Sequence, residues 1–302
     1  MIPPTGPPLS CEAFVAAVER LCLYRNHVIV VKLGGSAMEE PLAIDACLRS
    51  VAVLNQLGVS VVLVHGGGKP IDRAMAEAGL TAKKVAGRRY TDDATLGIVV
   101  RVLCEINRDI VARLRALGVP AVGHEDLATF PLRGERLLLP GPDLQPVDLG
   151  HVGKVTSVRP LTRTRGHDPG TPRDDSGRGC VPVLPSLAVS VEGTWLNVNA
   201  DTAASAVAGA FKAEKAIFLT DTPGVLRERN RPESIIPKLT EAECRELIAS
   251  GTIEGGMVPK VEACFEALQA GARAALIVDG RVPFSLLDVF LNEPFKGTEI
   301  TG

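Results

Sequence analysis

Short unbroken runs of apolar residues alternate along this chain with longer stretches in which apolar residues recur every three or four positions. The unbroken runs predict buried strands, the last of which we expect to close the sheet, at 28–31, 59–64, 181–184, 216–220 and 274–278. The helical spacing predicts helices at 11–24, 42–57, 70–78, 98–110 and 240–249, after Asp201 and around Lys260. This alternation indicates an α/β fold with a mostly parallel sheet and helices on both faces.

Three stretches depart from this pattern. Residues 1–9 are rich in proline and precede a helix for which Ser10 can serve as N-cap. Residues 123–150 are rich in Pro, Gly and charge, and we interpret them as a hairpin or lid. Residues 163–179 contain almost no apolar side chain, which is typical of a loop or insertion.

Composition narrows the function classes. The chain has 302 residues, a net charge of -2 and a pI near 6.2, so nothing draws it as a whole toward nucleic acid or membrane. Seven scattered cysteines without a CxxC pair argue for a reducing compartment and against a zinc cluster. No basic leader or run of membrane-spanning length is present, so we expect a soluble cytoplasmic protein whose anion site, if any, is local.

The first candidate for that site follows the first predicted strand. Lys32 stands at the end of a buried apolar run and is followed by Gly34 and Gly35. A cation there is costly unless an anion meets it, and adjacent glycines let backbone N–H groups approach that anion. An ordinary lysine reaching solvent beside a turn is the alternative.

A second glycine turn follows the second strand. Gly66, Gly67 and Gly68 lie between that strand and a helix that Pro70 marks near its start. Backbone N–H groups at a helix N-terminus, together with the helix dipole, form an anion site. Both turns fall at the carboxyl edge of the sheet, where ligands of such folds bind.

Other polar residues are candidates at strand and helix ends. Arg89 suits a substrate carboxylate, although an exposed arginine in a turn is often only solvated. Asp201 either caps its helix or holds charge in the site. Lys260 follows Gly255 and Gly256 in the first turn of a helix, where the dipole disfavours a cation unless an anion binds as well.

These residues describe a site for a highly charged, extended anion. Phosphoryl transfer needs that composition, because its catalysis is mostly positioning and charge stabilisation. The glycine turns do not have the spacing of the dinucleotide motif GxGxxG, and the sequence contains neither the GxxxxGK[ST] motif nor the protein kinase motifs. We expect Asp201 to hold the ammonium groups of both Lys32 and Lys260 in place.

Seven ordered motifs give the chain a clear resemblance from Val28 to Gly302. They read KLGGSAM, VHGGGKPID, GRRYTDDAT, VDLGHVGKV, NVNADTAA, LTDTPGVL and GGMVPKVEA. In this the chain resembles the amino acid kinase family, and most of all its branch that phosphorylates N-acetyl-L-glutamate. The resemblance implies an open αβα sandwich, ATP and Mg²⁺, transfer of the γ-phosphoryl group to a side-chain carboxylate, and a place in arginine biosynthesis. It also implies an N-terminal extension (1–26), a substrate lobe (27–190) and a nucleotide lobe (191–302).

The resemblance also implies a role for each matching residue. Lys32 and Lys260 would stabilise the transferring group, with Asp201 organising them. Substrate-side residues would be Gly66, Gly67, Arg89 and Asn197. Residues toward the nucleotide and its phosphates would be Gly34, Gly35, Thr220, Asp221, Gly224 and Gly256. No protein side chain is expected to hold a metal on its own.

Two departures from the family pattern concern the substrate. His124, Glu125, Asp126 and Pro131 stand where the family has a glycine- and serine-rich lid, and the 163–179 segment replaces a helix. Another N-acylated amino acid, or another small acid, is therefore an alternative substrate. A related carbamate or uridylate kinase and a non-catalytic amino-acid sensor are further alternatives.

The N-terminal helix and the tail bear on regulation. Both are similar to those of members that arginine inhibits and that assemble as hexamers through the helix. We therefore expect a dimer or hexamer, and the resemblance leaves two alternatives open, a chain that arginine inhibits and one that it does not. Leu33 and Phe284 stand where those members tend to have tyrosine and histidine, which argues against inhibition.

Overall fold

The computed structural model describes residues 10–85, 88–140, 146–161 and 179–302. Residues 163–178 of the expected loop and the proline-rich residues 1–9 lie outside these ranges. Gly87 of the GRRY motif lies outside them as well.

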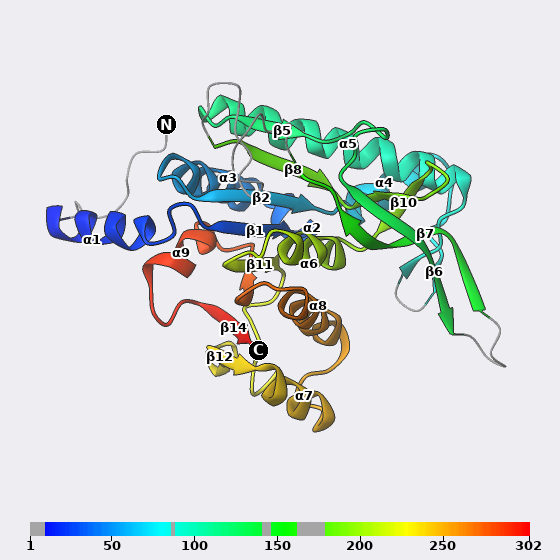
Figure 1. Ribbon diagram of the computed structural model, residues 1–302. Coiled ribbons are helices and arrows are strands. Elements are labelled where there is room, and N and C mark those ends of the chain that lie inside the picture. The colour runs from blue at the N-terminus through cyan, green and yellow to red at the C-terminus, as the bar shows by residue number, and fades with distance from the viewer. Residues whose placement is uncertain (1–9, 86–87, 141–145, 162–178) are drawn as a thin grey trace.

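One sheet of eight strands runs through the molecule (Figure 1). Its strands, in spatial order, are β12 (Lys238–Thr240), β14 (Gly297–Thr301), β13 (Ala275–Asp279), β11 (Lys215–Thr220), β1 (Val28–Leu33), β2 (Ser60–His65), β8 (Val181–Pro185) and β5 (Ala121–Gly123). All neighbours are parallel except β13 and β14. The expectation that residues 274–278 close the sheet is wrong, because β14 and β12 lie beyond β13. The predicted mostly parallel sheet is confirmed.

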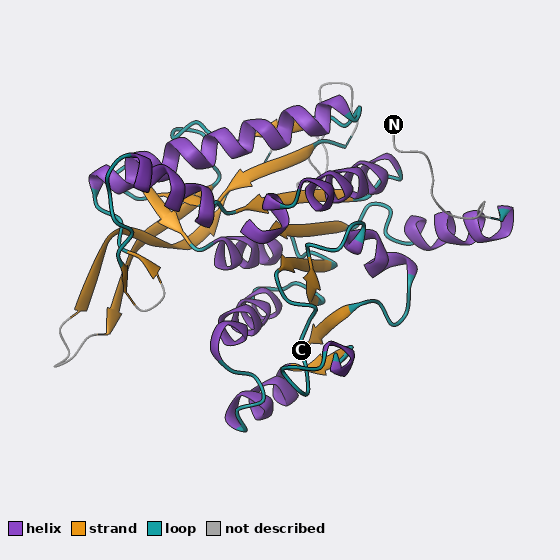
Figure 2. Ribbon diagram, turned by 180° about the vertical axis from the view of Figure 1, so that it is seen from behind, coloured by secondary structure: helices purple, strands orange, loops and turns teal. Residues whose placement is uncertain are grey.

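Helices cover both faces of this sheet. On one face pack α3 (Pro41–Gln56), α9 (Ser285–Leu291) and the second half of α5 (Asp93–Ala116). On the other lie α4 (Gly68–Glu77), α6 (Ala200–Ala210), α8 (Val258–Gln269) and the first half of α5. Figure 2 shows the molecule from behind, with the long α5 across the top. The α/β sandwich expected from the alternating pattern is therefore present.

Alternation along β1 decides which way its side chains point. Ile29, Val31 and Leu33 belong to the core under α3 and α9, whereas Val30 belongs to the core under α6 and α8. Since successive side chains on a strand point to opposite faces, Lys32 lies on the same side as Val30. The cation of the KLGG motif is thereby directed toward α6.

The expected hairpin is present, but it begins at Leu132 and ends at Val158, later in the chain than the predicted 123–150. Strands β6 (Leu132–Pro140) and β7 (Pro146–Val158) pair and project from one end of the sheet (Figure 1). With β9 (Leu187–Val189) and β10 (Trp195–Val198) they form a small closed barrel. This barrel takes strands from both sides of the expected boundary at residue 190.

The N-terminal helix α1 (Cys11–Cys22) begins where predicted. The Ser10 side chain accepts a hydrogen bond from the backbone N–H of Ala13 at 3.1 Å. Arg20 donates from Nη1 to the carbonyl of Leu291 at 2.7 Å, which joins α1 to α9. The remaining elements are α2 (Gly35–Glu39), β3 (Lys84–Val85), β4 (Arg88–Arg89) and α7 (Glu241–Ala249), with single 3-10 turns at Pro232–Ser234 and Gly255–Met257.

A search of the helices within the described ranges finds none long and apolar enough to cross a membrane.

Candidate active site

Lys32 and Asp201 form an ion pair at the carboxyl edge of the sheet. Lys32 is only 8% exposed, and its Nζ lies 2.8 Å from Oδ1 of Asp201. Asn199, not Asp201, caps α6: its Oδ1 accepts hydrogen bonds from the N–H groups of Asp201 at 2.7 Å and Thr202 at 3.2 Å. The carboxylate of Asp201 is therefore left to hold the buried ammonium group, close to the positive end of the helix dipole.

The glycines of the first turn are required by close packing. Gly34 donates its N–H to the carbonyl of Leu219 at 3.1 Å, and a Cβ at position 34 would lie 2.6 Å from that oxygen. A Cβ there would also lie 3.4 Å from Nζ of Lys32. Gly35, by contrast, has open space around it. The turn thus brings backbone close to the ammonium group and leaves room beside it for a ligand.

The second glycine turn lies against the start of α6. A Cβ at Gly66 would be 3.2 Å from the Cβ of Ala200, the residue before Asp201. A Cβ at Gly67 would be 2.9 Å from Leu103 on α5. Both glycine turns and the Lys32–Asp201 pair therefore meet at one edge of the sheet, as the strand ends predicted.

The expected substrate residues are linked through Thr91. Asn197 donates from Nδ2 to Oγ1 of Thr91 at 3.1 Å, and that hydroxyl donates to the carbonyl of Arg89 at 2.9 Å. Thr91 also receives the hairpin, because its carbonyl accepts from the N–H of His151 at 2.7 Å and its N–H donates to the carbonyl of Leu149 at 3.0 Å. The residues around Arg89 are in this way tied to the base of the β6–β7 hairpin.

The guanidinium of Arg89 is already held by the protein. Its Nη1 lies 2.6 Å from Oδ1 of Asp72 and 3.1 Å from the sulfur of Met75, and its Nη2 donates to the carbonyl of Gly68 at 3.2 Å. The side chain is largely buried. This fixes the plane of the guanidinium beside the second glycine turn, so the alternative of a merely solvated arginine is excluded.

We expect Arg89→Lys to raise the KM for an acidic substrate by about 10- to 100-fold, with a smaller effect on kcat. Lysine keeps the charge but loses the planar fork that grips a carboxylate. Initial rates over a range of acceptor concentrations measure this. The neighbouring Arg88→Lys is the matched control, and an equal rise in its KM would count against a specific role for Arg89.

Lys260 pairs with the residue that follows β11. Its Nζ lies 2.9 Å from Oδ1 of Asp221, and this hydrogen bond lowers the pKa of Asp221. The expectation that Asp201 holds both lysines therefore differs from the structure, which pairs Asp201 with Lys32 and gives Lys260 a different carboxylate. Asp201 lies in the first turn of α6, beside the end of β1, whereas Asp221 directly follows β11, so the two carboxylates take different ammonium groups.

The loop after β11 lines a cavity of about 400 Å³. Lys260 and Gly256 border it on one side, with Thr252–Glu254, and the stretch Asp221–Leu226 borders it on the other. Thr220, the buried last residue of β11, directly precedes this stretch, and its Oγ1 accepts a hydrogen bond from the N–H of Thr222 at 3.1 Å. Gly224, at φ 138°, leaves no room for a side chain, because its Cβ would be 2.7 Å from Oγ1 of Thr298. This cavity has the size and the strand-end position of a nucleotide pocket.

Helices α6 and α8 place the two lysines on the same edge. Ser205 donates from Oγ to the carbonyl of Ala263 at 2.7 Å, and a Cβ at Gly209 would lie 2.2 Å from that of Ala270. The contacts advance in the same direction along both helices, so the helices run parallel; Figure 1 shows α6 and α8 as neighbours. Their first turns, which carry Asp201 and Lys260, therefore lie side by side.

Sequence reasoning missed three residues of this region. Asp72 and Thr91 hold the substrate-side residues, and Asn107 supports the second glycine turn from α5. Asp72 and Thr91 both lie inside the quoted motifs VHGGGKPID and GRRYTDDAT, which is a signal that could have found them. Asn107 had no signal beyond being a polar residue on an apolar helix face.

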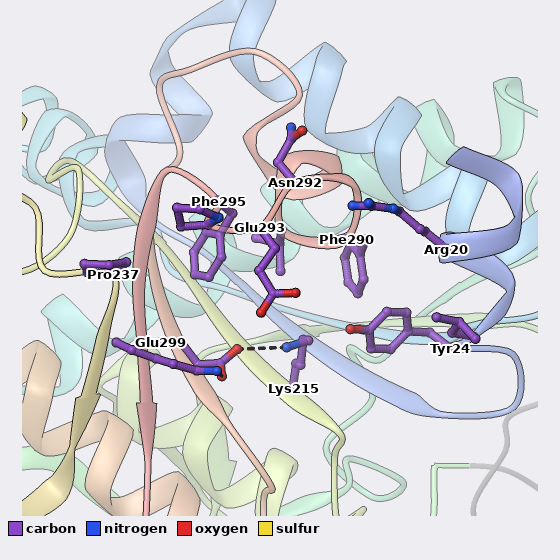
Figure 3. A pocket seen from close by; sticks show the side chains of 13 residues that line it. Arg20, Tyr24, Lys215, Pro237, Phe290, Asn292, Glu293, Phe295 and Glu299 are labelled. Atoms are coloured by element: carbon purple, nitrogen blue, oxygen red, sulfur yellow. Dashed lines mark hydrogen bonds and ion pairs between the residues drawn. The ribbon is translucent and has the colours of Figure 1, made fainter. Parts of the chain in front are cut away.

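A second cavity, of about 520 Å³, lies at the opposite edge of the sheet (Figure 3). Tyr24 and Arg20 border it from the N-terminal segment, and Tyr24 packs edge-on against Phe290 with ring centroids 4.9 Å apart. Lys215 pairs with Glu299 at 3.0 Å, and the carboxylate of Glu293 points into the cavity. Lys238 lines the cavity as well, so aromatic rings, two carboxylates, two ammonium groups and the guanidinium of Arg20 surround it, which suits a small zwitterion.

Within the described ranges, no group of three or more His, Cys, Asp or Glu side chains is arranged to hold a metal ion.

Comparisons with known proteins agree on the kind of molecule. A family model described as the amino acid kinase family matches residues 27–279. The chain is 39% identical over 292 residues to an acetylglutamate kinase of Synechococcus elongatus, covering 95% of this chain and 90% of that protein. It is 38% identical over 299 residues to an acetylglutamate kinase of Azorhizobium caulinodans, covering 97% and 95%.

Solved structures share the fold at lower identity. N-acetylglutamate synthase from Neisseria gonorrhoeae, complexed with coenzyme A and L-arginine, aligns with a TM-score of 0.74 at 22% identity, over 97% of this chain and 66% of that one. Carbamate kinase from Giardia lamblia bound to AMP-PNP aligns with a TM-score of 0.58 at 15% identity, over 91% and 98%. At these identities the likeness concerns the fold alone.

Proposed function

The chain belongs to the amino acid kinase family, and we propose that it transfers the γ-phosphoryl group of ATP to the side-chain carboxylate of N-acetyl-L-glutamate, giving an acyl phosphate for arginine biosynthesis. The identity of 38% and 39% to acetylglutamate kinases, which extends over nearly the full length of the chain, supports this substrate. The single structural observation that carries it is a pair of lysines, each held by a carboxylate: Lys32 near the end of β1, beside the glycine turns, and Lys260 in the first turn of α8.

The reaction needs little bond chemistry from the protein. A carboxylate oxygen of the substrate attacks the γ-phosphorus while the bond to the departing ADP oxygen breaks, and no proton has to move. ATP and Mg²⁺ supply the phosphoryl group and neutralise part of its charge when bound. Mg²⁺ is ordinarily held by phosphates, waters and one or two carboxylates, so the absence of a three-residue acidic cluster from the described residues is compatible with it.

The chain's own residues divide the remaining work. Lys32 and Lys260 place positive charge on either side of the transferring group, and Asp201 and Asp221 fix the two ammonium groups in advance. Gly34, Gly35, Gly66 and Gly67 offer backbone N–H groups. Arg89 and Asn197 would bind the acylated amino acid, and Thr220, Asp221, Gly224 and Gly256 lie at the cavity proposed for the nucleotide.

The test is ADP release measured by a coupled assay over a panel of acceptors at fixed ATP. We expect N-acetyl-L-glutamate to give the highest kcat/KM, ahead of N-acetyl-L-aspartate, free glutamate, carbamate and UMP. A different N-acylated acid in first place would replace the substrate but keep the reaction. Ligand binding without ADP release from any acceptor would favour the sensor alternative.

We propose in addition that L-arginine inhibits the enzyme by binding the cavity of Figure 3. Arginine should bind there because the Glu293 carboxylate can pair with its guanidinium or α-amino group. Bound arginine should lower the initial rate. Glu293→Gln should raise the half-inhibiting arginine concentration at least about tenfold and leave the uninhibited rate unchanged. An unchanged wild-type rate in saturating arginine would remove this proposal.

The assembly proposed is a dimer that helix α1 extends to a hexamer. Phe14 and Val15 on α1 are exposed although α1 is packed on α9, so they are free to meet a second copy. Deleting residues 1–25 should reduce the particle to a dimer in analytical ultracentrifugation. A truncated chain that sediments as the same oligomer as the intact chain would contradict a role for α1.

A further inference from the structure

A fully buried imidazole lies directly behind the second glycine turn. His65 ends β2 and has no exposed surface. Its Nδ1 lies 3.1 Å from the carbonyl oxygen of Gly66, and its Nε2 lies 3.3 Å from Nδ2 of Asn107. Asn107, on α5, is equally buried. The proposed reaction gives neither residue a part, yet both are placed against a backbone segment of the site.

The hydrogen-bond partners determine which ring nitrogen carries the proton. Nδ2 of Asn107 lies 3.0 Å from the carbonyl oxygen of Val183, and a carbonyl can only accept, so the amide nitrogen must face that way. Its second hydrogen then points to Nε2 of His65. Nε2 is therefore the acceptor, and Nδ1–H donates to the carbonyl of Gly66.

The protonation state of this ring is equally constrained. Burial lowers the pKa of His65 to about 4, so the ring is neutral near pH 7. Register neighbours Leu33 on β1 and Pro185 on β8 carry no charge. The surrounding elements carry ionisable groups, among them Lys32 on β1, Cys104 and Arg108 on α5, and His124 after β5.

This bond orients the peptide group between Gly66 and Gly67. In a planar trans peptide the C=O and the N–H point in opposite directions. With the Gly66 carbonyl drawn toward His65 in the core, the N–H of Gly67 is turned away from the imidazole. Two adjacent glycines leave this peptide free to rotate, so something has to hold it.

The side chain of Asn107 makes its hydrogen bonds through Nδ2 at a cost to its oxygen. Its Oδ1 is buried and has no hydrogen-bond partner among the described residues. A Cβ at Gly123 would lie 2.3 Å from that same oxygen, so the position admits only glycine while Asn107 stays in place. An unsatisfied buried acceptor is unfavourable, and retaining it implies that the two bonds made by Nδ2 matter.

We propose that His65 and Asn107 are positioning residues for phosphoryl transfer, locking the Gly66–Gly67 peptide so that the Gly67 N–H donates to an oxygen of the transferring phosphoryl group. This inference rests on the proposed kinase function. Asn107 fixes the Nδ1–H tautomer of His65, and this tautomer fixes the orientation of the Gly66–Gly67 peptide. The peptide then supplies one pre-aligned N–H donor, that of Gly67.

The sharpest test is Asn107→Asp measured against pH. A carboxylate only accepts, so it forces the proton onto Nε2 and leaves a bare Nδ1 facing the Gly66 carbonyl, which should turn the peptide and lose the Gly67 donor. When the ring takes up a second proton, both nitrogens donate again, and the new carboxylate raises the pKa of the ring. We expect kcat relative to wild type to fall about 100-fold at about pH 8 and to recover at least tenfold by about pH 6.

Asn107→Leu is the matched control, because it removes the amide without adding a carboxylate, so its rate relative to wild type should stay flat with pH. Since all three proteins carry His124, Cys104 and Arg108, those groups cancel in the ratio. A flat ratio for Asn107→Asp would overturn the proposal.

A second pair of variants tests His65 itself. In His65→Asn the amide nitrogen takes the place of Nδ1 and can still donate to Gly66, whereas His65→Leu cannot. We expect His65→Asn to keep at least about tenfold more kcat than His65→Leu, with KM values for both substrates within about threefold of wild type. Equal loss in both variants would mean that His65 matters only for packing.

The wild-type tautomer can be read without turnover or substitution. In ¹⁵N spectra of the histidine-labelled chain, one of the five imidazoles should show the Nδ1–H tautomer and remain neutral from about pH 5.5 to 8.5. An Nε2–H tautomer, or titration near pH 6.5, for His65 would overturn the proposal. A wild-type chain that shows this spectrum yet releases no ADP would instead refute the kinase function.

Discussion

Replacing Lys32 with Met should lower kcat about 1,000-fold. The ammonium group is pre-positioned in a nearly buried site, so it needs no rearrangement as charge develops on the transferring group. Methionine keeps most of the length and the apolar stem, so the loss is that of the charge. Steady-state rates with both substrates saturating measure the effect.

Folding has to be separated from chemistry in this variant, because Asp201 is left without its cation. The Lys212→Met variant is the matched control: Lys212 lies past the other end of α6 and is exposed, so neither rate nor stability should change. A cooperative unfolding transition and intact nucleotide binding in Lys32→Met, with kcat lowered, are the expected combination. A kcat within threefold of wild type would remove Lys32 from the catalytic machinery.

Replacing Lys260 with Ala should lower kcat about 100-fold while the KM values change much less. Lys260 stands in the first turn of α8, where the dipole opposes its charge, and borders the cavity proposed for the nucleotide. This placement suggests that the Lys260 ammonium group acts on the phosphoryl group, and that their interaction strengthens during the transfer. Equal losses in kcat and in binding would indicate only ground-state contact.

Lys260→Arg is the companion of this variant. Arginine retains the charge and can still reach Asp221, so part of the lost rate should return. Lys260 is the group that lowers the pKa of Asp221, so in Lys260→Ala that pKa should rise toward its ordinary value. Asp221 remains a carboxylate near pH 7 in either case, and the loss of rate should therefore show no new pH dependence between about pH 6 and 8.

Much of the fold was predictable because buried parallel strands are continuous apolar runs. Strands β1, β2, β8, β11 and β13 all fall where such runs stand, within about two residues. Strand β14, with the sequence GTEIT, has no such run. It lies between β13 and the edge strand β12, and only the tertiary structure shows that it extends the sheet. Helix α4 begins at Gly68, two residues before the proline that marked its start.

The site was predictable in its residue types and less so in its pairings. Lys32 lies beside Asp201, as expected, because the alternation along β1 turns it toward α6. Lys260 pairs with Asp221 instead of Asp201, since which carboxylate is nearer depends on the loop after β11 and on how α8 packs. Asp72, Thr91 and Asn107 act across long sequence separations, which local patterns do not reveal.

Hydroxylamine trapping shows whether this strand-edge site makes an acyl phosphate. Acyl phosphates react with hydroxylamine to give a hydroxamate, whereas phosphate esters do not. With ATP, Mg²⁺ and N-acetyl-L-glutamate, the wild-type chain should form hydroxamate in proportion to ADP, and Lys32→Met should form almost none. ADP release without hydroxamate would rule out an acyl phosphate product, and hydroxamate formed equally by Lys32→Met would rule out the proposed role of Lys32.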